Sequence, residues 1–574
     1  MSQKIIPNYT KVRASNGDID HINIPLKGRE LLNVPLLNKG MAFSKEERDK
    51  FELTGLLPSS IETLDEQVKR HYRQFQTKDT SLGKHVFLMQ LHDYNVTAFY
   101  RLVQDHMEEM LPIVYTPTVG ESVQNFSMLI RRPRGIYLNY EDKDHIDEII
   151  GQHVSDEIDF IIVTDGEAVL GIGDQGVGGM DISVGKLMVY ILFSGIDPSR
   201  VLPVFLDVGT DNEELLNDPV YIGRREKRIR GKEYDDFIDI FVTSIQNNFP
   251  NVYLHWEDFG RDTARMNLER YQDVMCTFND DMQGTGIVTT ANILSAIEGQ
   301  GLSMADQRIV MHGAGTASCG IADQICDTLI AAGLSKEEAH KRFWIINSKG
   351  LLTKHQDNIQ YFQEPYVHTK ESVSNWNVSD VKRITLEEVV VNAKPTILVG
   401  CSTAYNAFNE KIVKEMLKYI ERPIIMPLSN PTSKSEAHPD DLIKWTDGKA
   451  IIATGSPFKP VQHNGKQYDV SQGNNAYIFP GLGLGIVAVK ASRLTGGMIR
   501  AACQALSELS PFRQDNTQPL LRPITGAREV SQIIAKAVIT QAIKDDVCTV
   551  DISDVDQRIR QIQWEPKYYD YESI

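Results

Sequence analysis

The feature that most limits the fold is a repeated alternation of short apolar runs with helix-like segments. Runs such as DFIIVTDG, VLPVFLDVG and VYLHWEDFG recur between residues 157 and 277, and the pattern returns later in QRIVMHGAG, RFWIINSKG and PTILVGCS. Apolar runs of this length, separated by helices, predict parallel strands with helical crossovers. Each run ends in small or polar residues, the position at which open α/β sheets bind ligands. The pattern therefore predicts two α/β units.

The composition argues against several classes of function. The chain has 574 residues, of which 41% are hydrophobic and 24% charged, and it contains no apolar run long enough to cross a bilayer. A net charge of −17 argues against a nucleic acid partner, because phosphate binding relies on clustered Lys and Arg. We therefore expect neither a membrane nor a nucleic acid as a partner.

The cysteines and the first residues bear on the compartment. Six cysteines are scattered without a CxxC pair, which argues against structural zinc or a disulfide framework and is typical of a reducing environment. The first twenty residues lack the apolar core of a secretory signal. We expect a cytoplasmic protein, with the mitochondrial matrix left open.

One stretch, TDGEAVLGIGDQGVGGMDISVGK, contains seven glycines and ends on Lys186. It is not a P-loop, because five residues instead of four separate Gly179 from Gly185, and Leu187 replaces the hydroxyl that would contact magnesium. A run of tight turns between buried strands is an equally simple interpretation. Upstream, Pro112 and Pro117 bracket LPIVYTP, for which we expect a short extended run that presents Tyr115 before a turn.

A strand, a glycine turn and a helix are predicted in RIVMHGAGTASCGIADQI. This arrangement places a dinucleotide pyrophosphate on a helix N-terminus. The fingerprint is imperfect, because Ser318 stands where a third glycine is usual. The residues expected to bind the cofactor here are Gly313, Ala314, Gly315, Thr316, Ala317 and Ser318.

The end of the next predicted strand bears on the choice between NAD and NADP. An acid that binds the adenosine ribose is usual there, but this chain has Asn347. Asn347 can hydrogen-bond a hydroxyl, whereas Ser348 and Lys349 could tolerate a 2′-phosphate. Chemistry alone leaves the choice open.

The fold class follows from these patterns. Between residues 46 and 130, charged and apolar positions at three- and four-residue spacing predict helices. We expect an α/β protein in which a helical N-terminal domain precedes an α/β catalytic domain and a Rossmann-type domain with a doubly wound parallel sheet. The expected domains are 1–130 (helical), 131–278 (catalytic), 279–467 (Rossmann-type), 468–540 (a return segment completing the catalytic domain) and 541–574 (a C-terminal arm). The arm, WEPKYYDYESI, could pack on a neighbouring subunit, or follow a plain helix as a loose end.

Two acidic pairs follow predicted strands, Glu257-Asp258 in HWEDFG and Asp280-Asp281 in FNDDMQG. Clustered carboxylates without histidine or cysteine suit a hard cation such as Mg²⁺ or Mn²⁺. A solvated turn is the plain alternative for either pair alone. Such a metal would bind a 2-hydroxy acid through its carboxylate and C2 oxygen.

Lys186 and Tyr115 are candidates for proton transfer. A lysine in a glycine-rich, largely apolar segment can lose proton affinity through desolvation, and a tyrosine becomes a useful proton donor or acceptor beside a cation. An exposed or salt-bridged role is the usual one for a single lysine. The spacing does not show whether the two residues meet.

Taken together, the segments are similar to those of the malic enzymes. The similarity runs through nearly the whole chain and includes MLPIVYTPTVG, TDGEAVLGIGDQGVGGM, VFLDVGTDNEELLNDPVYIG, FNDDMQGTG and QGNNAYIFPGLGLG. The resemblance implies oxidation of L-malate with NAD or NADP and Mg²⁺ or Mn²⁺, decarboxylation of the bound oxaloacetate, and release of pyruvate. It also implies a homotetramer built from dimers, or a homodimer.

The resemblance also implies roles for individual residues. Lys186 would be the general base that takes the C2 hydroxyl proton, with Asp280 as its partner, and Tyr115 would be the general acid that protonates C3 of the enolpyruvate. The implied metal ligands are Glu257, Asp258 and Asp281. The implied substrate contacts are Asn430, Asn474 and Asn475, of which Asn430 also reaches the cofactor.

Two departures from the family pattern leave alternatives open. Many malic enzymes have arginine at the position of Ala168, whereas the malolactic enzymes, which return lactate, have a small residue there. Asn347 stands where NAD-using members usually have aspartate, but YFQEP lacks the lysine of NADP-specific animal enzymes, which favours NAD. We therefore favour a malic enzyme over a malolactic enzyme, and both over a nucleotide-sensing protein that has lost catalysis.

Overall fold

The chain forms two compact units in the computed structural model, which describes residues 9–14, 17–153 and 157–574. Unit 1 consists of Met1–Phe278, Pro480–Thr495 and Ala527–Ile574, and unit 2 of Asn279–Phe479 and Gly496–Gly526. The predicted return segment 468–540 is thus divided between the units. Its residues 496–526 belong to unit 2, where α21 (Gly496–Glu508) packs on α14 (Thr285–Gly299).

Unit 1 begins with two strands, which are followed by a helical region. These elements are β1 (Thr10–Arg13), β2 (Ile19–Ile24), α1 (Gly28–Leu32), α2 (Lys45–Lys50), α3 (Leu64–Gln76), α4 (Ser81–Tyr94), α5 (Val96–Asp105), α6 (Met107–Val114), α7 (Thr118–Gln124) and α8 (Phe126–Leu129). α3 shows why the helices form. Thr63 and Glu66 make a capping box at its start, and Val68 and Phe75 are buried on one side. The helices predicted between residues 46 and 130 are confirmed.

The expected extended run around Tyr115 is wrong. Residues Met107–Val114 form α6 with Pro112 inside the helix, and the extended conformation begins only at Tyr115, at φ −131° and ψ −152°. Proline weakens a helix interior, but Met110, Ile113 and Val114 are buried on this helix, and that packing outweighs the local preference.

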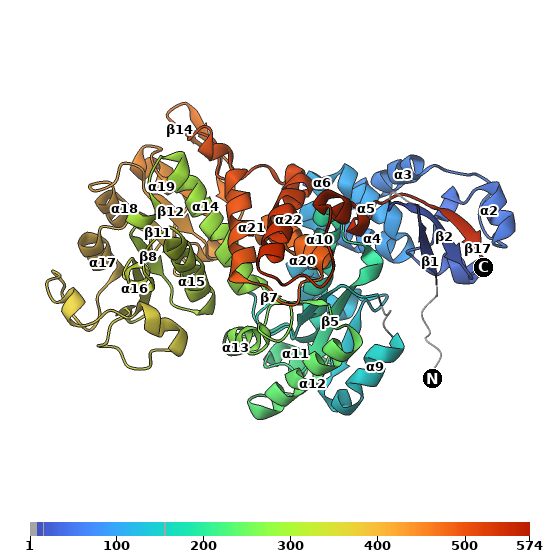
Figure 1. The fold of residues 1–574 in the computed structure, drawn as a ribbon, viewed down its shortest axis with the longest axis horizontal. Helices are drawn as coiled ribbons and strands as arrows, with labels where there is room; N and C mark the ends of the chain where they lie inside the picture. The colour runs from blue at the N-terminus through green and yellow to red at the C-terminus, as the bar shows by residue number, and fades with distance from the viewer. Residues whose placement is uncertain (1–8, 15–16, 154–156) are drawn as a thin grey trace. The chain divides into compact units, whose positions relative to one another are not determined.

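The C-terminal segment is an ordered part of unit 1. After α22 (Ala527–Lys544) and α23 (Val555–Ile562), β17 (Asp570–Ser573) pairs in parallel with β2, and Figure 1 shows the red β17 beside the dark-blue β1 and β2. The Tyr571 hydroxyl donates to the Leu37 carbonyl oxygen (3.0 Å), and the Lys39 ammonium lies 3.9 Å from the centroid of the Tyr571 ring. The loose end considered from the sequence is therefore wrong.

The central sheet of unit 1 is the first predicted α/β unit. Its strand order is β3-β5-β4-β6-β7, and β3, β5, β4 and β6 pair in parallel. The strands are β3 (Ile136–Asn139), β4 (Phe160–Thr164), β5 (Val201–Asp207), β6 (Tyr253–Trp256) and β7 (Thr277–Asn279). The helices are α9 (Ile146–His153), α10 (Met180–Ser194), α11 (Glu213–Asn217), α12 (Lys232–Asn248), α13 (Arg261–Tyr271) and α20 (Phe479–Val489). Because the strands are parallel, the ends of β4 and β6 meet at one edge of the sheet.

α10 is the core helix of unit 1 and packs against β4, β5, α7 and α22. By length and composition alone, residues 176–194 could cross a membrane, but 94% of that apolar window is buried within the structure. A helix that is apolar on all sides needs such surroundings. Among the buried residues of α10, only Lys186 carries a charged side chain. Its chemistry therefore depends on the group with which it pairs.

Unit 2 is a doubly wound sheet with the order β10-β9-β8-β11-β12-β13-β16. The pairs of β8 with β9 and β11, of β11 with β12, and of β12 with β13 are parallel, and only β10 and β9 form an antiparallel pair in the main sheet. The strand order reverses between β8 and β11, which is where such sheets bind dinucleotides. This confirms the Rossmann-type fold that the sequence predicts.

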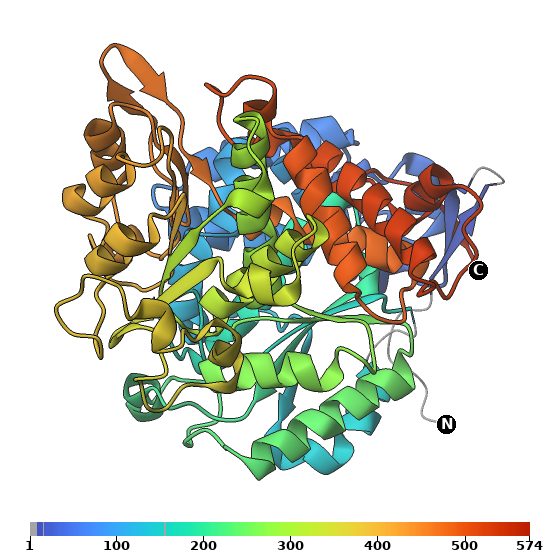
Figure 2. The same ribbon diagram turned by 60° about the vertical axis from the view of Figure 1, so that its left-hand side comes forward.

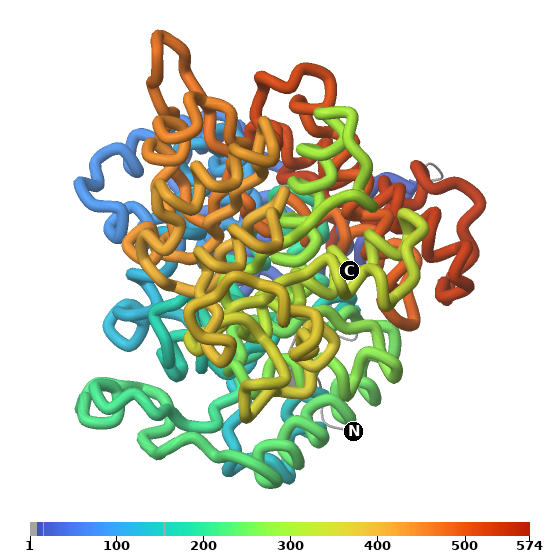
Figure 3. Tube along the Cα trace, turned by 90° about the vertical axis from the view of Figure 1, so that its left-hand side faces the viewer, coloured from blue at the N-terminus to red at the C-terminus, as the bar shows by residue number. Residues whose placement is uncertain are grey.

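Helices surround these strands (Figure 1), and the hairpin of β14 and β15 extends from unit 2 in Figure 2 and Figure 3. The strands are β8 (Ile309–His312), β9 (Phe343–Asn347), β10 (Gly350–Leu351), β11 (Ile397–Gly400), β12 (Ile424–Pro427), β13 (Ile451–Thr454), β14 (Val461–His463), β15 (Lys466–Tyr468) and β16 (Ser471–Gln472). The helices not yet given are α15 (Thr316–Ala331), α16 (Lys336–His340), α17 (Leu386–Ala393), α18 (Glu410–Met416) and α19 (Pro439–Thr446).

Candidate active site

Lys186 lies in the buried core of unit 1 and pairs with an acid. Its side chain is 4% exposed, and its ammonium group donates to Oε1 of Glu257, the residue that follows β6. The other oxygen of Glu257 lies 2.9 Å from Nε2 of His255, whose Nδ1 lies 2.9 Å from the Tyr190 hydroxyl. Lys186 thus belongs to a buried chain of polar groups that also fixes Glu257.

Asp258 is held in an unusual backbone conformation at the same edge of the sheet. Its φ of +54° is in the left-handed region, which is costly for a residue other than glycine and is frequent at functional sites. Its carbonyl oxygen accepts a hydrogen bond from the Ala168 N–H (3.0 Å). The glycine-rich stretch is therefore bound directly to one of the predicted metal ligands.

Tyr115 lies against α10 at Gly185, the residue that precedes Lys186. It is 7% exposed and directly follows α6. A Cβ atom added to Gly185 would lie 3.2 Å from the Val114 carbonyl oxygen and 3.6 Å from the Tyr115 ring, so the glycine allows this close approach. The structure thus brings the Tyr115 ring to the residue that precedes Lys186, which the sequence could not show.

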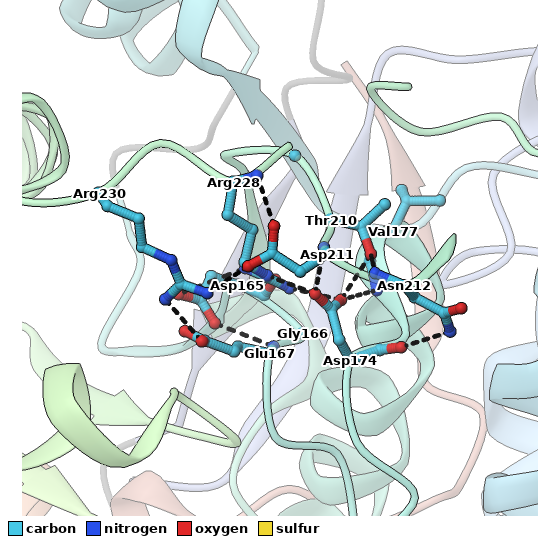
Figure 4. Close-up of polar contacts among 12 residues, drawn as sticks. Asp165, Gly166, Glu167, Asp174, Val177, Thr210, Asp211, Asn212, Arg228 and Arg230 are labelled. Carbon is cyan, nitrogen blue, oxygen red and sulfur yellow. Dashed lines mark hydrogen bonds and ion pairs between the residues drawn. The ribbon is translucent and has the colours of Figure 1, made fainter. Parts of the chain in front are cut away.

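An arginine that the sequence gave no reason to select organises the glycine-rich stretch, as Figure 4 shows. Arg228 is buried, and its Nε and Nη2 donate to the two carboxylate oxygens of Asp174 at 2.7 and 2.8 Å. Nη2 also donates to the Asp165 carbonyl oxygen (2.9 Å), and Nη1 lies 3.7 Å from the Asp165 carboxylate. Burial raises the pKa of Asp165 to about 6, although the Arg228 charge opposes the shift. Arg228 thus binds both ends of the turn that carries Ala168.

Replacing Arg228 with methionine is expected to lower the free energy of unfolding by about 3–5 kcal/mol, because the buried carboxylate of Asp165 and the partly buried carboxylate of Asp174 lose their cation. The matched control is Arg230→Met. The Arg230 side chain is 49% exposed and pairs with Glu167 (2.6 Å) and Asp211 (2.7 Å), as Figure 4 shows, so its loss should cost less than about 1 kcal/mol. Urea unfolding of both variants, followed by circular dichroism, measures the difference. Equal shifts of the two midpoints would contradict this role of Arg228.

In unit 2, the predicted dinucleotide loop joins β8 to α15. Gly313 has a φ of +121°, and a Cβ atom there would lie 2.4 Å from the Cys401 carbonyl oxygen, so only glycine fits. At Gly315 a Cβ atom would meet no atom within 4 Å, which leaves open space in front of the helix N-terminus. The Ser318 hydroxyl donates to the Gly313 carbonyl oxygen (2.8 Å). Ser318, which replaces the usual third glycine, therefore stabilises the turn.

Two glutamines that the sequence gave no reason to select hold the residues predicted to bind the cofactor. The Gln363 amide donates to the Ala314 carbonyl oxygen (2.6 Å). Gln356 accepts from the Asn347 amide (2.9 Å), whereas the Asn347 amide oxygen accepts from the Lys349 N–H (2.8 Å). Asn347 therefore ends β9 with its side chain already oriented, and a remaining lone pair of its oxygen can meet a ribose hydroxyl.

The predicted acid Asp280 is held by an asparagine of the same unit. It begins the π-helical turn η5 (Asp280–Gly284), and its Oδ2 accepts from the Asn475 amide (2.9 Å), which also donates to Thr285 (3.0 Å). A Cβ atom at Gly284 would lie 1.9 Å from Asp280 Oδ1, so glycine is required there. Asn475 thus positions Asp280.

The two other predicted substrate asparagines lie in different surroundings. The Asn430 amide oxygen accepts from the Ser456 hydroxyl (2.5 Å), so its NH₂ group is the part left to face a ligand. The Asn474 amide oxygen accepts from the Ala476 N–H (2.9 Å) at the start of a 3₁₀ turn. Glu257 and Asp258 belong to unit 1, whereas Asp280 and Asp281 belong to unit 2, so the joint use of these acids stays a prediction.

Comparison with known proteins identifies relatives along nearly the whole chain. Residues 92–272 match the family described as the malic enzyme N-terminal domain, and residues 282–543 match the malic enzyme NAD binding domain. The NAD-dependent malic enzyme 3 of Bacillus subtilis is 49% identical over 550 residues, which cover 95% of this chain and 97% of that protein. The NAD-dependent malic enzyme of Aliivibrio salmonicida is 45% identical over 97% of this chain and 99% of its own length.

Solved structures share the fold. The malic enzyme of Entamoeba histolytica aligns with a TM-score of 0.55 at 23% identity and covers 89% of this chain and 90% of its own. The malic enzyme of Pyrococcus horikoshii aligns with a TM-score of 0.52 at 23% identity over 79% of this chain and 89% of its own.

Proposed function

Because the chain belongs to the malic enzyme family, we propose that it oxidises L-malate with NAD and releases pyruvate and CO₂. The observation that carries the proposal is the buried Lys186, paired with Glu257 and adjoined by Tyr115 across Gly185. A proton acceptor and a proton donor at one place are what malate oxidation followed by ketonisation of an enol requires. The reaction needs both within the same pocket.

The donor groups fit the cofactors that this reaction uses. Glu257 and Asp258 are buried oxygen donors that follow β6, and Asp281 follows its sheet neighbour β7 after one residue. We propose that these three carboxylates hold Mg²⁺ or Mn²⁺, which are hard cations. When bound, the metal would polarise the C2 oxygen of malate and stabilise negative charge on it. The open space at Gly315 fits the pyrophosphate of NAD, the hydride acceptor.

The proton steps fall to residues of this chain. Lys186, in its neutral amine form, takes the proton of the C2 hydroxyl as hydride leaves C2, and Asp280, held by Asn475, serves as its partner. After CO₂ leaves, the Tyr115 hydroxyl donates a proton to C3 of the enol. The NH₂ group of Asn430 faces a substrate carboxylate, and Asn474 and Asn475 complete this contact surface.

A direct assay tests the proposal. The purified protein is incubated with L-malate, Mn²⁺ and either NAD or NADP, while reduced nicotinamide, pyruvate and lactate are measured separately. We expect pyruvate and reduced cofactor in equal amounts, with NAD preferred over NADP. Lactate without accumulated NADH would establish malolactic chemistry instead, which Ala168 favours. Tight nicotinamide binding without turnover would indicate a sensing protein. Assembly as a homotetramer or homodimer and a cytoplasmic location belong to the same proposal.

Ala168→Arg is expected to lower the KM for malate about ten- to a hundredfold, since a charge-assisted hydrogen bond contributes about 1.5–3 kcal/mol. Ala168 is exposed, and its backbone N–H is bound to Asp258, so the longer side chain has room without moving the turn. Ala168→Met is the control, because it adds a comparable stem without the guanidinium. An unchanged KM in the arginine variant would mean that the pocket has no use for this contact.

A further inference from the structure

Unit 2 contains a fully buried carboxylate that none of the predicted roles uses. Glu436 lies before α19 and is 0% exposed. Among the ion pairs of the described residues, none includes Glu436. Burying an unpaired carboxylate is costly unless hydrogen bonds to the charged form replace water. The structure must therefore supply those hydrogen bonds, and their source indicates what Glu436 does.

The hydrogen bonds to Glu436 come from two loops at the ligand-binding edge of the sheet. Oε1 accepts from the N–H (2.7 Å) and hydroxyl (2.9 Å) of Ser402, which follows β11, and from the Ser429 hydroxyl (2.5 Å), which follows β12. Oε2 accepts from the Ser429 N–H (3.3 Å). The Ser429 hydroxyl in turn accepts from the Thr403 N–H (2.9 Å). One carboxylate thus joins the loops that end two adjacent parallel strands.

Both loops touch residues that the proposed function uses. The first lies on the dinucleotide turn, because the Cys401 carbonyl oxygen occupies the space that a Cβ atom on Gly313 would need. The second continues directly from Ser429 into Asn430. Gly400 is also required, since a Cβ atom there would lie 2.6 Å from the Glu436 carboxyl carbon. A shift of Glu436 would therefore move a cofactor loop and a substrate residue together.

We propose that Glu436 is a positioning residue that fixes the loop at 401–403, which lies on the predicted dinucleotide turn, relative to Asn430. This role rests on the proposed function, because malate oxidation requires the cofactor near the first loop and the substrate near the second to be held in a fixed relation. The carboxylate is suited to this role because it only accepts hydrogen bonds, and the groups that face it are donors. A misplacement of about 1 Å in such a constellation can reduce turnover about a hundredfold.

Glu436→Gln tests the proposal with little change in volume. The glutamine oxygen can keep the three contacts of Oε1, but its NH₂ group then faces the Ser429 N–H, so two donors oppose each other. We expect kcat/KM for malate to fall about ten- to a hundredfold, because Asn430 moves with Ser429. NADH binding without malate, measured by fluorescence titration, should change less than about threefold, since the Ser402 contacts persist.

Two further variants separate positioning from stability. Ser429→Ala removes the hydroxyl that links Glu436 to Thr403. If the two residues act as one unit, kcat/KM of the double variant, Glu436→Gln with Ser429→Ala, should be no lower than that of the less active single variant. Glu388→Gln is the matched control in the same unit. Glu388 accepts from the N–H groups of Thr385 (2.9 Å) and Ser379 (2.6 Å) at the start of α17, and these hydrogen bonds involve neither loop, so this variant should lower only the melting temperature.

Three results would overturn the positioning role. The first is an E436Q enzyme with the kcat/KM of the parent. The second is a double variant in which the two single losses of kcat/KM multiply. The third is a loss of activity that is matched by equal losses of melting temperature and NADH affinity. Failure of the proposed function is distinguishable, because the parent protein would then not oxidise malate in the same assay, and the role of Glu436 would fall with it.

Discussion

Lys186→Arg is expected to lower kcat for malate oxidation by roughly two to four orders of magnitude, the usual contribution of a general base. The guanidinium can still pair with Glu257 but does not release a proton in proteins, so the substitution removes the base and keeps the buried charge. The rate of NADH formation with saturating malate, Mn²⁺ and NAD measures the effect. Thermal unfolding of the same preparation shows whether the fold is retained.

A second substitution at the same position separates charge from proton transfer. Lys186→Met leaves the buried Glu257 without its ammonium partner, so we expect a loss of stability of about 3–5 kcal/mol together with the loss of activity. The arginine variant should lose activity only. An arginine variant whose kcat stays within about tenfold of the parent would exclude Lys186 as the base.

Tyr115→Phe is expected to slow the exchange of C3 hydrogens of pyruvate with solvent, which proceeds through the reverse of the proposed protonation step. In D₂O with Mn²⁺ and NADH, the parent should replace the methyl hydrogens of pyruvate with deuterium, and the variant should do so about 10²- to 10⁴-fold more slowly. Phenylalanine keeps the ring that packs beside Gly185, so the fold should not change. Nuclear magnetic resonance of the pyruvate methyl group measures the exchange.

Tyr100→Phe is the control for this experiment. Tyr100 is also buried in unit 1, where its ring packs edge-on against Trp564, but it lies on α5 and has no predicted role. Loss of the Tyr100 hydroxyl should leave the rate of deuterium exchange into pyruvate unchanged. If Tyr115→Phe exchanges deuterium as fast as Tyr100→Phe, another group protonates C3.

Much of the fold could be predicted because the strands of both sheets are short and apolar and end in small or polar residues. β6 ends before Glu257 and β7 before Asp280, as the local pattern indicates. The failure at Tyr115 has a different origin. Whether Pro112 breaks a helix depends on what Met110 and Ile113 pack against, and the helices that α6 contacts, α4, α5 and α7, are separate segments whose packing the local pattern does not record.

The partners of the site residues were harder to predict than the residues themselves. Lys186 could be chosen from its apolar surroundings, but its ion pair with Glu257 joins positions 71 residues apart. Arg228 lies in the charged run GRREKRIRG, and Glu436 in PTSKSEAHPDD, and both runs look like solvated loops. Their burial results from the return of each loop to a sheet edge, which no local pattern records.

The division of the chain between the units has a consequence for its synthesis. The main segment of unit 2, Asn279–Phe479, leaves the ribosome whole, so the Rossmann-type sheet can form as soon as that segment is free. Unit 1 is completed later, because α10 packs against α22 and β2 pairs with β17, and both of these partners follow the segments of unit 2 along the chain. Until α22 has been made, part of the apolar surface of α10 has no packing partner. The unit that begins first is therefore the last to be finished, and it is the part of the nascent protein most in need of protection from aggregation.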